Sequence, residues 1–254
     1  MSENIFLNGL FIYAKIISYM GLLNTLLDII FPVNCISCGK TGIDLCITCL
    51  MNSPSAERES AKWIFPLYDY RHPLIKKALW LFKYKGKKRL ASIFAEILYE
   101  KIIEELSDLS VMENFVEPIL IPIPLSLKRH RERGYNQAEL ICRELIKINN
   151  LRHLPAETLA RAGVLDEKLN FTLEKNVLIK PKETKHQARI HNRNERLKNI
   201  IGSFAIKNEN INKIKNRNII LIDDIITTSA TLNEARKILK QTGARKIIAF
   251  TVAH

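Results

Sequence analysis

The segment spanning residues 218–252 constrains the fold more than any other part of the chain. It opens with the apolar run NIILI at residues 218–222 and continues through a short polar loop. An apolar stripe at helical spacing follows and ends at Gly243, and residues 246–252 (KIIAFTV) form a second apolar run. Strand, loop, helix and strand in this order predict a βαβ unit, with a parallel sheet and a right-handed crossover. We therefore expect an α/β fold.

Two adjacent carboxylates, Asp223 and Asp224, directly follow the first predicted strand. Ligands of open α/β sheets bind beyond the carboxyl ends of strands. The next residues form a small, hydroxyl-rich loop that leads into the helix: Thr227, Thr228, Ser229, Ala230 and Thr231. Helix-start N–H groups and Thr hydroxyls can bind a phosphate, while paired carboxylates can accept sugar hydroxyls and favour Mg²⁺. The pattern favours a ribose 5-phosphate derivative, and the alternative is an ordinary helix cap.

The string IILIDDIITTSAT at residues 219–231 resembles the 5-phosphoribosyl-1-pyrophosphate (PRPP) signature of the type I phosphoribosyltransferases. This resemblance implies that Asp223 and Asp224 hold the ribose hydroxyls and that residues 227–231 cradle the 5-phosphate. Ser229 departs from the family, which usually has Gly at this position. Gly allows a loop backbone to close tightly and to reach positive φ.

Four of the five cysteines lie close together, as two CxxC pairs formed by Cys35, Cys38, Cys46 and Cys49. This clustering is typical of metal binding in a reducing cytosol rather than of a secreted disulfide scaffold. Four thiolates complete a tetrahedral shell for Zn²⁺, and because the protein fills every position we expect a structural zinc. A redox dithiol and an iron–sulfur cluster are the alternatives.

The presence of both motifs in one chain resembles the ComF family of competence proteins. Residues 121–125 (IPIPL), Arg129 and residues 133–138 (RGYNQA) are similar to that family's PVPL…R…RGFNQA block. Residues 83–86 (KYKG) are similar to its basic element. A further family segment is matched by Thr184, Gln187, Arg193, Arg196, Asn199, Gly202 and Phe204. The similarity covers most of residues 28–254, in order.

The resemblance implies a Rossmann-like type I phosphoribosyltransferase fold with a parallel sheet and a small N-terminal four-Cys zinc knuckle. It also implies that PRPP is bound together with Mg²⁺. The pyrophosphate loop would follow the apolar run at residues 118–124, where the candidate ligands are Ser126, Arg129, Arg133 and Asn136. Guanidinium groups suit pyrophosphate chemically. The alternative for these basic residues is a solvated helix start.

Three regions are expected along the chain. Residues 1–30 form an apolar or amphipathic helix, residues 31–58 the zinc knuckle, and residues 59–254 the phosphoribosyltransferase-like domain. Within this last region we expect strands at 63–70 and 118–124, and helices at 72–84, 90–102 and from residue 138 to residue 146. Residues 162–178 look like an insertion relative to the family.

The location expected is cytoplasmic, or peripheral at the inner face of the membrane. A spanning N-terminal helix would bury Lys15 near its centre, which is costly, so we favour a helix that docks on the protein over one that contacts lipid. Competence DNA-translocation proteins are candidate partners, because the family is associated with the uptake of transforming DNA.

Two functions remain open. The first is an enzyme that transfers the phosphoribosyl group from PRPP to a nitrogen nucleophile. The second is a non-catalytic adaptor that uses the same fold to bind single-stranded DNA. The net charge of +13 favours polyanionic partners such as nucleic acid, and the alternative is a well-solvated basic protein with Lys-rich usage. Near the basic loop at residues 83–89, the aromatic residues Trp80, Phe82 and Tyr84 are either stacking platforms or core.

Overall fold

The computed structural model describes residues 33–57, 61–151, 172–181, 200 and 202–254. The chain divides into two compact units, residues 1–49 and residues 50–254. The helix expected over residues 1–30 lies outside the described residues, and the domain boundaries expected at residues 30 and 58 stay predictions. Among the described residues, no helix has the length and apolar character that crossing a bilayer requires.

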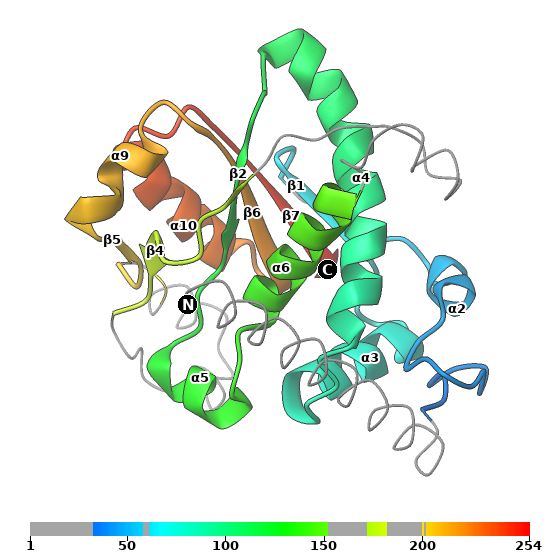
Figure 1. Cartoon of the computed structure of the whole chain (residues 1–254). Helices are drawn as coiled ribbons and strands as arrows, with labels where there is room; N and C mark the ends of the chain where they lie inside the picture. The colour runs from blue at the N-terminus through cyan, green and yellow to red at the C-terminus, as the bar shows by residue number, and fades with distance from the viewer. Residues whose placement is uncertain (1–32, 58–60, 152–171, 182–199, 201) are drawn as a thin grey trace, which may run out of the picture. The chain divides into compact units, whose positions relative to one another are not determined.

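A five-stranded parallel sheet forms the centre of the second unit (Figure 1). Its strands are β1 (Ile64–Tyr68), β2 (Ile119–Pro122), β3 (Thr172–Leu173), β6 (Asn218–Ile225) and β7 (Lys246–Ala253). They lie in the order β1-β7-β6-β2-β3, and every neighbouring pair is parallel. The α/β fold with a parallel sheet, predicted from the βαβ pattern, is confirmed.

Helices cover both faces of this sheet. Figure 1 shows α10 (Ala230–Gln241) behind the sheet, with α4 (Leu90–Glu113) and α6 (Gln137–Leu151) in front of it. On the α10 side, alternate strand residues such as Ile119 and Ile219 join Leu232 of α10 in one apolar cluster. Because side chains of a strand alternate between faces, a continuous apolar strand can bury both of its sides.

The smaller elements complete this unit. Helix α3 (Pro73–Tyr84) precedes α4, and α5 (Leu127–Arg133) lies between β2 and α6. An antiparallel pair, β4 (Leu178–Ile179) with β5 (Ala205–Ile206), is followed by the short helical segments η1 (Asn208–Asn210) and α9 (Ile211–Ile214). Part of the expected insertion at 162–178 therefore belongs to the fold, since it supplies the edge strand β3 and Leu178 of β4.

The strand that carries the acidic pair is longer than the sequence indicated. We expected it to stop at Ile222, but β6 continues to Ile225, which lies opposite Ala253 of β7. Asp223 and Asp224 are therefore residues of the strand itself rather than of the loop that follows. The extension arises because β7 continues alongside and pairs with both the apolar and the polar part of β6.

The order of the strands creates a crevice at one position. From β2 the chain passes through α5 and α6 to β3, on one side of the sheet. From β6, the other neighbour of β2, it passes through α10 to β7, on the opposite side. Connections leaving two neighbouring strands in opposite directions mark the point where an open α/β sheet binds its ligands. This point lies beyond the carboxyl ends of β2 and β6, and β6 carries the two aspartates there.

Candidate functional site

A cavity of about 360 Å³ lies at this crevice. Its wall combines the segment after β2, the end of β6 with the loop that follows, and the last turn of α3. Most of the residues predicted from the sequence line it, namely Asp223, Asp224, Thr227, Thr228, Thr231, Ser126, Arg129, Arg133 and Asn136. Ser229 and Ala230 are not among the lining residues. Four positively charged side chains face two carboxylates here, which favours an anionic ligand.

The two aspartates differ in their surroundings. Asp224 is buried, and its Oδ1 lies 2.9 Å from Nζ of Lys83. The carboxylate of Asp223 accepts a hydrogen bond from the N–H of Asp224 at 2.8 Å. Burial, followed by the charge of Asp224, raises the pKa of Asp223 to about 7. The cavity thus holds one carboxylate that has a cation beside it and a second that is reluctant to ionise.

The hydroxyl-rich loop leads directly into α10. Ser229 is the N-cap residue, its carbonyl accepts the N–H of Asn233 at 2.7 Å, and its side chain makes no capping hydrogen bond. The first turn of α10 contains no acidic residue. Such a helix start offers N–H groups and the positive end of the helix dipole to an anion. Ser229 has a φ of −2°, outside the left-handed region that Gly favours.

The segment after β2 forms the opposite wall, and the expected pyrophosphate loop contains the short helix α5, which carries its basic residues. Ser126 is the N-cap of α5, where its Oγ accepts the N–H of Arg129 at 3.4 Å. Arg133, at the end of this helix, donates to Oε1 of Gln137 at 3.0 Å. These contacts hold Arg129 and Arg133 at one end of the sheet, beside the cavity.

Asn136 lines the cavity, yet its amide has partners within the protein. Its Nδ2 donates to the carbonyl of Ile123 at 3.0 Å, and its Oδ1 accepts the N–H of Ala138 at 3.1 Å. The side chain therefore ties the end of β2 to the start of α6. Direct contact of Asn136 with a ligand stays a prediction, and the structure gives this residue a clear role in shaping the loop.

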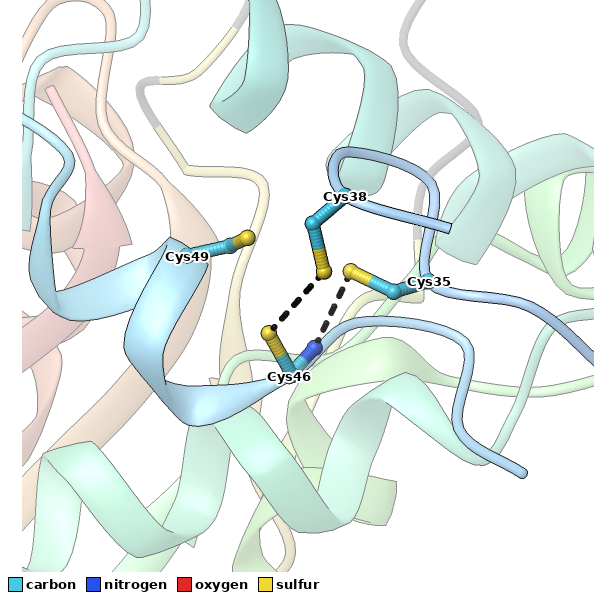
Figure 2. Close-up of side chains that lie close together, drawn as sticks. All are labelled: Cys35, Cys38, Cys46 and Cys49. Atoms are coloured by element: carbon cyan, nitrogen blue, oxygen red, sulfur yellow. Dashed lines mark hydrogen bonds between the residues drawn. The ribbon is translucent and has the colours of Figure 1, made fainter. Parts of the chain in front are cut away.

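The four predicted metal ligands lie together in the first unit (Figure 2). The Sγ atoms of Cys35, Cys38, Cys46 and Cys49 all lie within 4.8 Å of one another, and those of Cys38 and Cys46 are 3.7 Å apart. A tetrahedral zinc with Zn–S bonds near 2.3 Å requires S···S separations of about 3.8 Å. The four residues therefore fit a tetrahedral metal.

Backbone hydrogen bonds shape this cluster. The N–H of Gly39 donates to the carbonyl of Cys35 at 3.0 Å, and Gly39 turns the chain with a φ of 76°. The thiol of Cys35 is buried, which opposes ionisation, but N–H groups of Cys38, Cys46 and Ser37 point at it and lower its pKa to about 6. A thiolate held by amide donors is prepared for a cation.

Comparison with known proteins agrees with the phosphoribosyltransferase-like part of this arrangement. The family described as "Phosphoribosyl transferase domain" matches residues 155–254. "Competence protein F" of Haemophilus influenzae is 26% identical over 226 residues, which cover 85% of this chain and 83% of that protein. "Competence protein ComFC" of Bacillus subtilis is 31% identical, over 73% of this chain and 62% of that protein. These matches support a ComF-family protein with a phosphoribosyltransferase domain.

More distant similarities extend the comparison. "DNA utilization protein YhgH" of Escherichia coli K12 is 23% identical, over 80% of this chain and 74% of that protein. A solved hypoxanthine phosphoribosyl transferase from Trypanosoma cruzi has a TM-score of 0.36 and 10% sequence identity, and the match covers 63% of each chain. The last likeness is too remote to bear on the site.

Two lysines, Lys83 and Lys180, also line the cavity, although no ligand role was predicted for them. Lys83 belongs to the KYKG element, and it lines the cavity from the last turn of α3. Lys180 follows β4, and its Nζ lies 5.2 Å from the ring centre of Phe204. Burial and the charge of Arg129 lower the pKa of Lys180. The similarity of residues 83–86 to the family was the available signal for Lys83.

The acidic pair fits a Mg²⁺ that arrives with a phosphate ligand better than one held by the protein alone. One carboxylate has an ammonium beside it, and the other accepts a backbone N–H. Mg²⁺ is commonly bound through one or two carboxylates together with substrate phosphates. Asp223 and Asp224 would therefore supplement the phosphate oxygens rather than form a complete cage.

Proposed function

We propose that this ComF-family protein binds PRPP in the cavity between β2 and β6 and acts in the handling of DNA during uptake. One arrangement carries the first part of this proposal. A strand delivers two carboxylates and a hydroxyl-rich helix start to one side of a cavity whose other side is basic. Carboxylates suit a sugar diol, a helix start suits a monophosphate, and guanidinium groups suit a pyrophosphate. PRPP joins these three groups in one molecule.

The residue roles follow from this assignment. Asp223 and Asp224 accept the ribose hydroxyls, and the loop at residues 227–231 receives the 5-phosphate. Ser126, Arg129 and Arg133 hold the pyrophosphate, with Asn136 fixing their loop. Mg²⁺ bound with PRPP supplies positive charge to the pyrophosphate oxygens. The zinc proposed for Cys35, Cys38, Cys46 and Cys49 is structural.

Transfer of the phosphoribosyl group is the enzymatic form of this proposal. A nitrogen nucleophile would form a bond to the anomeric carbon while the bond from that carbon to pyrophosphate breaks, and the bonding electrons would leave with pyrophosphate. The developing charge on pyrophosphate would be met by Arg129 and Arg133, which face the cavity. A ribose ring that becomes cationic would be stabilised by the nearby Asp223.

The DNA-uptake part of the proposal is supported by relatives whose names refer to competence and to DNA utilization. We propose a cytoplasmic location, because a cluster of free thiols that binds a metal is typical of a reducing compartment; a peripheral position at the inner face of the membrane is the alternative. Competence DNA-translocation proteins are the proposed partners.

Titration calorimetry of the full chain with PRPP, with and without Mg²⁺, tests the central claim. We expect saturable binding at one site per chain that is tighter in the presence of Mg²⁺. Ribose 5-phosphate should compete for the same site, because it carries the diol and the 5-phosphate. Absence of a binding signal for PRPP under both conditions would refute the proposal.

A second candidate function is binding of single-stranded DNA. Trp80 and Tyr84 are 47% and 60% exposed, and Nζ of Lys85 and the guanidinium of Arg133 lie 5.2 Å from their respective ring centres. Exposed rings beside cations are what nucleic-acid bases and backbone phosphates require. Phe82, which we had grouped with these aromatics, is instead buried in the core and takes no part in such a surface.

Replacement of Trp80 by Ala tests this second function. We expect the variant to bind a short oligothymidine about tenfold more weakly, since base–aromatic stacking contributes roughly 1–3 kcal/mol per base. The wild type should also lose affinity steeply as salt concentration rises. Fluorescence anisotropy measures both effects. Leu151→Ala, at an exposed apolar residue at the end of α6, is the control. Equal affinity of the Trp80 and Leu151 variants would contradict the prediction.

A further inference from the structure

Lys83 is placed like a residue of the site rather than like a surface lysine. It lies in the last turn of α3, and its side chain is only 13% exposed. Its ammonium lies 2.9 Å from Oδ1 of Asp224, whose side chain is 8% exposed. Both side chains line the cavity. An ion pair removed from water to this degree is far less screened than a pair at the surface.

The backbone around Lys83 is held by packing on both sides. The ring of its neighbour Phe82 is fully buried, with the rings of Phe94 and Tyr135 at 5.7 and 6.1 Å between centres. The hydroxyl of Tyr135 donates to the carbonyl of Phe82. Tyr84, on the other side, accepts a hydrogen bond from the Arg133 guanidinium at 3.4 Å. Packing therefore fixes the backbone that carries Lys83, and the contact with Asp224 places its ammonium.

Charge balance indicates what this ammonium does. A buried carboxylate is stable only when an opposite charge or several donors compensate for its lost hydration. Two adjacent carboxylates would otherwise attract a divalent cation to the empty cavity. Lys83 supplies the compensating charge at Asp224 from within the protein, and its neighbour Tyr84 accepts a hydrogen bond from Arg133.

We propose that Lys83 is the resident counter-ion of Asp224 in the ligand-free protein and a phosphate-binding residue in the complex. The proposal rests on PRPP binding as the proposed function. When a ribose hydroxyl takes its place at Asp224, the ammonium is released to the pyrophosphate oxygens. Mg²⁺ would be supplied together with PRPP, because Lys83 balances the charge of Asp224 in the ligand-free protein.

Melting curves recorded with and without millimolar Mg²⁺ test the first half of this proposal. The wild type should melt at the same temperature in both conditions. Lys83→Met should melt at a lower temperature, and Mg²⁺ should restore part of the loss where an equal ionic strength of NaCl does not. Lys76→Met is the matched control, because Lys76 is an exposed residue of the same helix that does not line the cavity. A Lys83→Met melting temperature equal to that of this control, with no response to Mg²⁺, would overturn the proposal.

Calorimetry with inorganic pyrophosphate tests the second half. We expect Lys83→Met to bind pyrophosphate at least about tenfold more weakly than the wild type, as expected for the loss of a charge-assisted contact. Lys76→Met should remain within about twofold of the wild type. Equal affinities for the two variants would overturn the phosphate-binding role.

A third variant keeps the test decisive if Lys83→Met does not fold. Lys83→Met combined with Asp224→Asn removes both charges, so it should fold and melt above Lys83→Met alone; a double variant that is equally unstable would contradict the counter-ion role.

Failure of the proposed function is a separate result. If the wild type bound neither PRPP nor pyrophosphate, PRPP binding would be refuted, and with it the phosphate-binding role of Lys83, while the melting curves would still decide the counter-ion role.

Discussion

Replacement of both Asp223 and Asp224 by Asn is expected to abolish detectable PRPP binding. Each carboxylate would accept a ribose hydroxyl, and a hydrogen bond to a charged group contributes roughly 1.5–3 kcal/mol. Loss of both should raise the dissociation constant at least about a hundredfold, since about 1.4 kcal/mol corresponds to a factor of ten. Asn keeps the size of the side chain, but it removes the charge and replaces one acceptor oxygen with an NH2 donor. Calorimetry in the presence of Mg²⁺ measures the effect.

Asp69→Asn is the matched control for this experiment. Asp69 directly follows β1 at the same end of the sheet, pairs with Arg71 at 3.1 Å and does not line the cavity. The Asp69→Asn variant should bind PRPP with the affinity of the wild type. If the Asp223/Asp224 double variant also bound within about threefold of the wild type, the acidic pair would have no part in ligand binding.

The single variant Asp223→Asn adds a readout in pH that does not depend on any ligand. The fold raises the pKa of Asp223 from 3.8 to about 7, so the native state binds more protons than the unfolded state between these values. The contribution of Asp223 to stability is therefore fully present below pH 4 and is lost as pH rises through 7. Asn does not titrate. The free energy of unfolding of the variant, relative to that of the wild type, should therefore rise from pH 5 to pH 8, by on the order of 2 kcal/mol for a partly exposed carboxylate. Urea denaturation at the two pH values measures the difference, and an equal difference at both would contradict the shifted pKa.

Removal of the metal is expected to unfold the cysteine cluster while leaving the sheet intact. Structural zinc sites in small modules bind with an apparent free energy of roughly 10–16 kcal/mol, and this energy is also the folding energy of the module. After chelation, the amides of Cys35 and Gly39, which donate within the knuckle, should exchange with solvent rapidly. Those of Ile220 and Leu221 in β6 should stay protected. Hydrogen exchange with mass spectrometry measures both sets in one experiment.

Two cysteine variants distinguish the loss of a metal ligand from the loss of any other thiol. Cys46→Ser should lose the metal by elemental analysis, because it removes one of four clustered ligands. Cys142→Ala should retain one metal per chain, since Cys142 is buried in α6 outside the cluster. Wild-type protein purified without metal, or exchange of the knuckle amides unchanged by chelation, would refute the structural zinc.

The parts of the fold that sequence reasoning found are those determined by neighbouring residues. The run from Asn218 to Val252 contains a strand, a loop, a helix and a strand in local order, and this order is sufficient to imply a parallel sheet. The spacing of the cysteines was likewise sufficient to predict that the four sulfurs meet. In each case the decisive contacts join residues close in the chain, so the pattern carries the information.

The parts that were missed depend on contacts between distant residues. The length of β6 is set by its pairing with β7, which continues the ladder through Asp223 to Ile225 although the sequence becomes polar. The ion pair that defines the acidic side of the cavity joins residues 83 and 224, from α3 and β6. No local pattern indicates that these two side chains meet, because their approach depends on how α3 packs against α4 and Tyr135.

The strand order has a consequence for how the chain is made. β1 (Ile64–Tyr68) hydrogen-bonds to β7 (Lys246–Ala253), and β2 to β6, so two strands synthesised early find these neighbours only when the late ones have left the ribosome. Until then the nascent polypeptide carries apolar segments with unsatisfied edges, which are prone to aggregation. A chain truncated before Lys246 is therefore expected to lose its sheet, because β7 lies between β1 and β6.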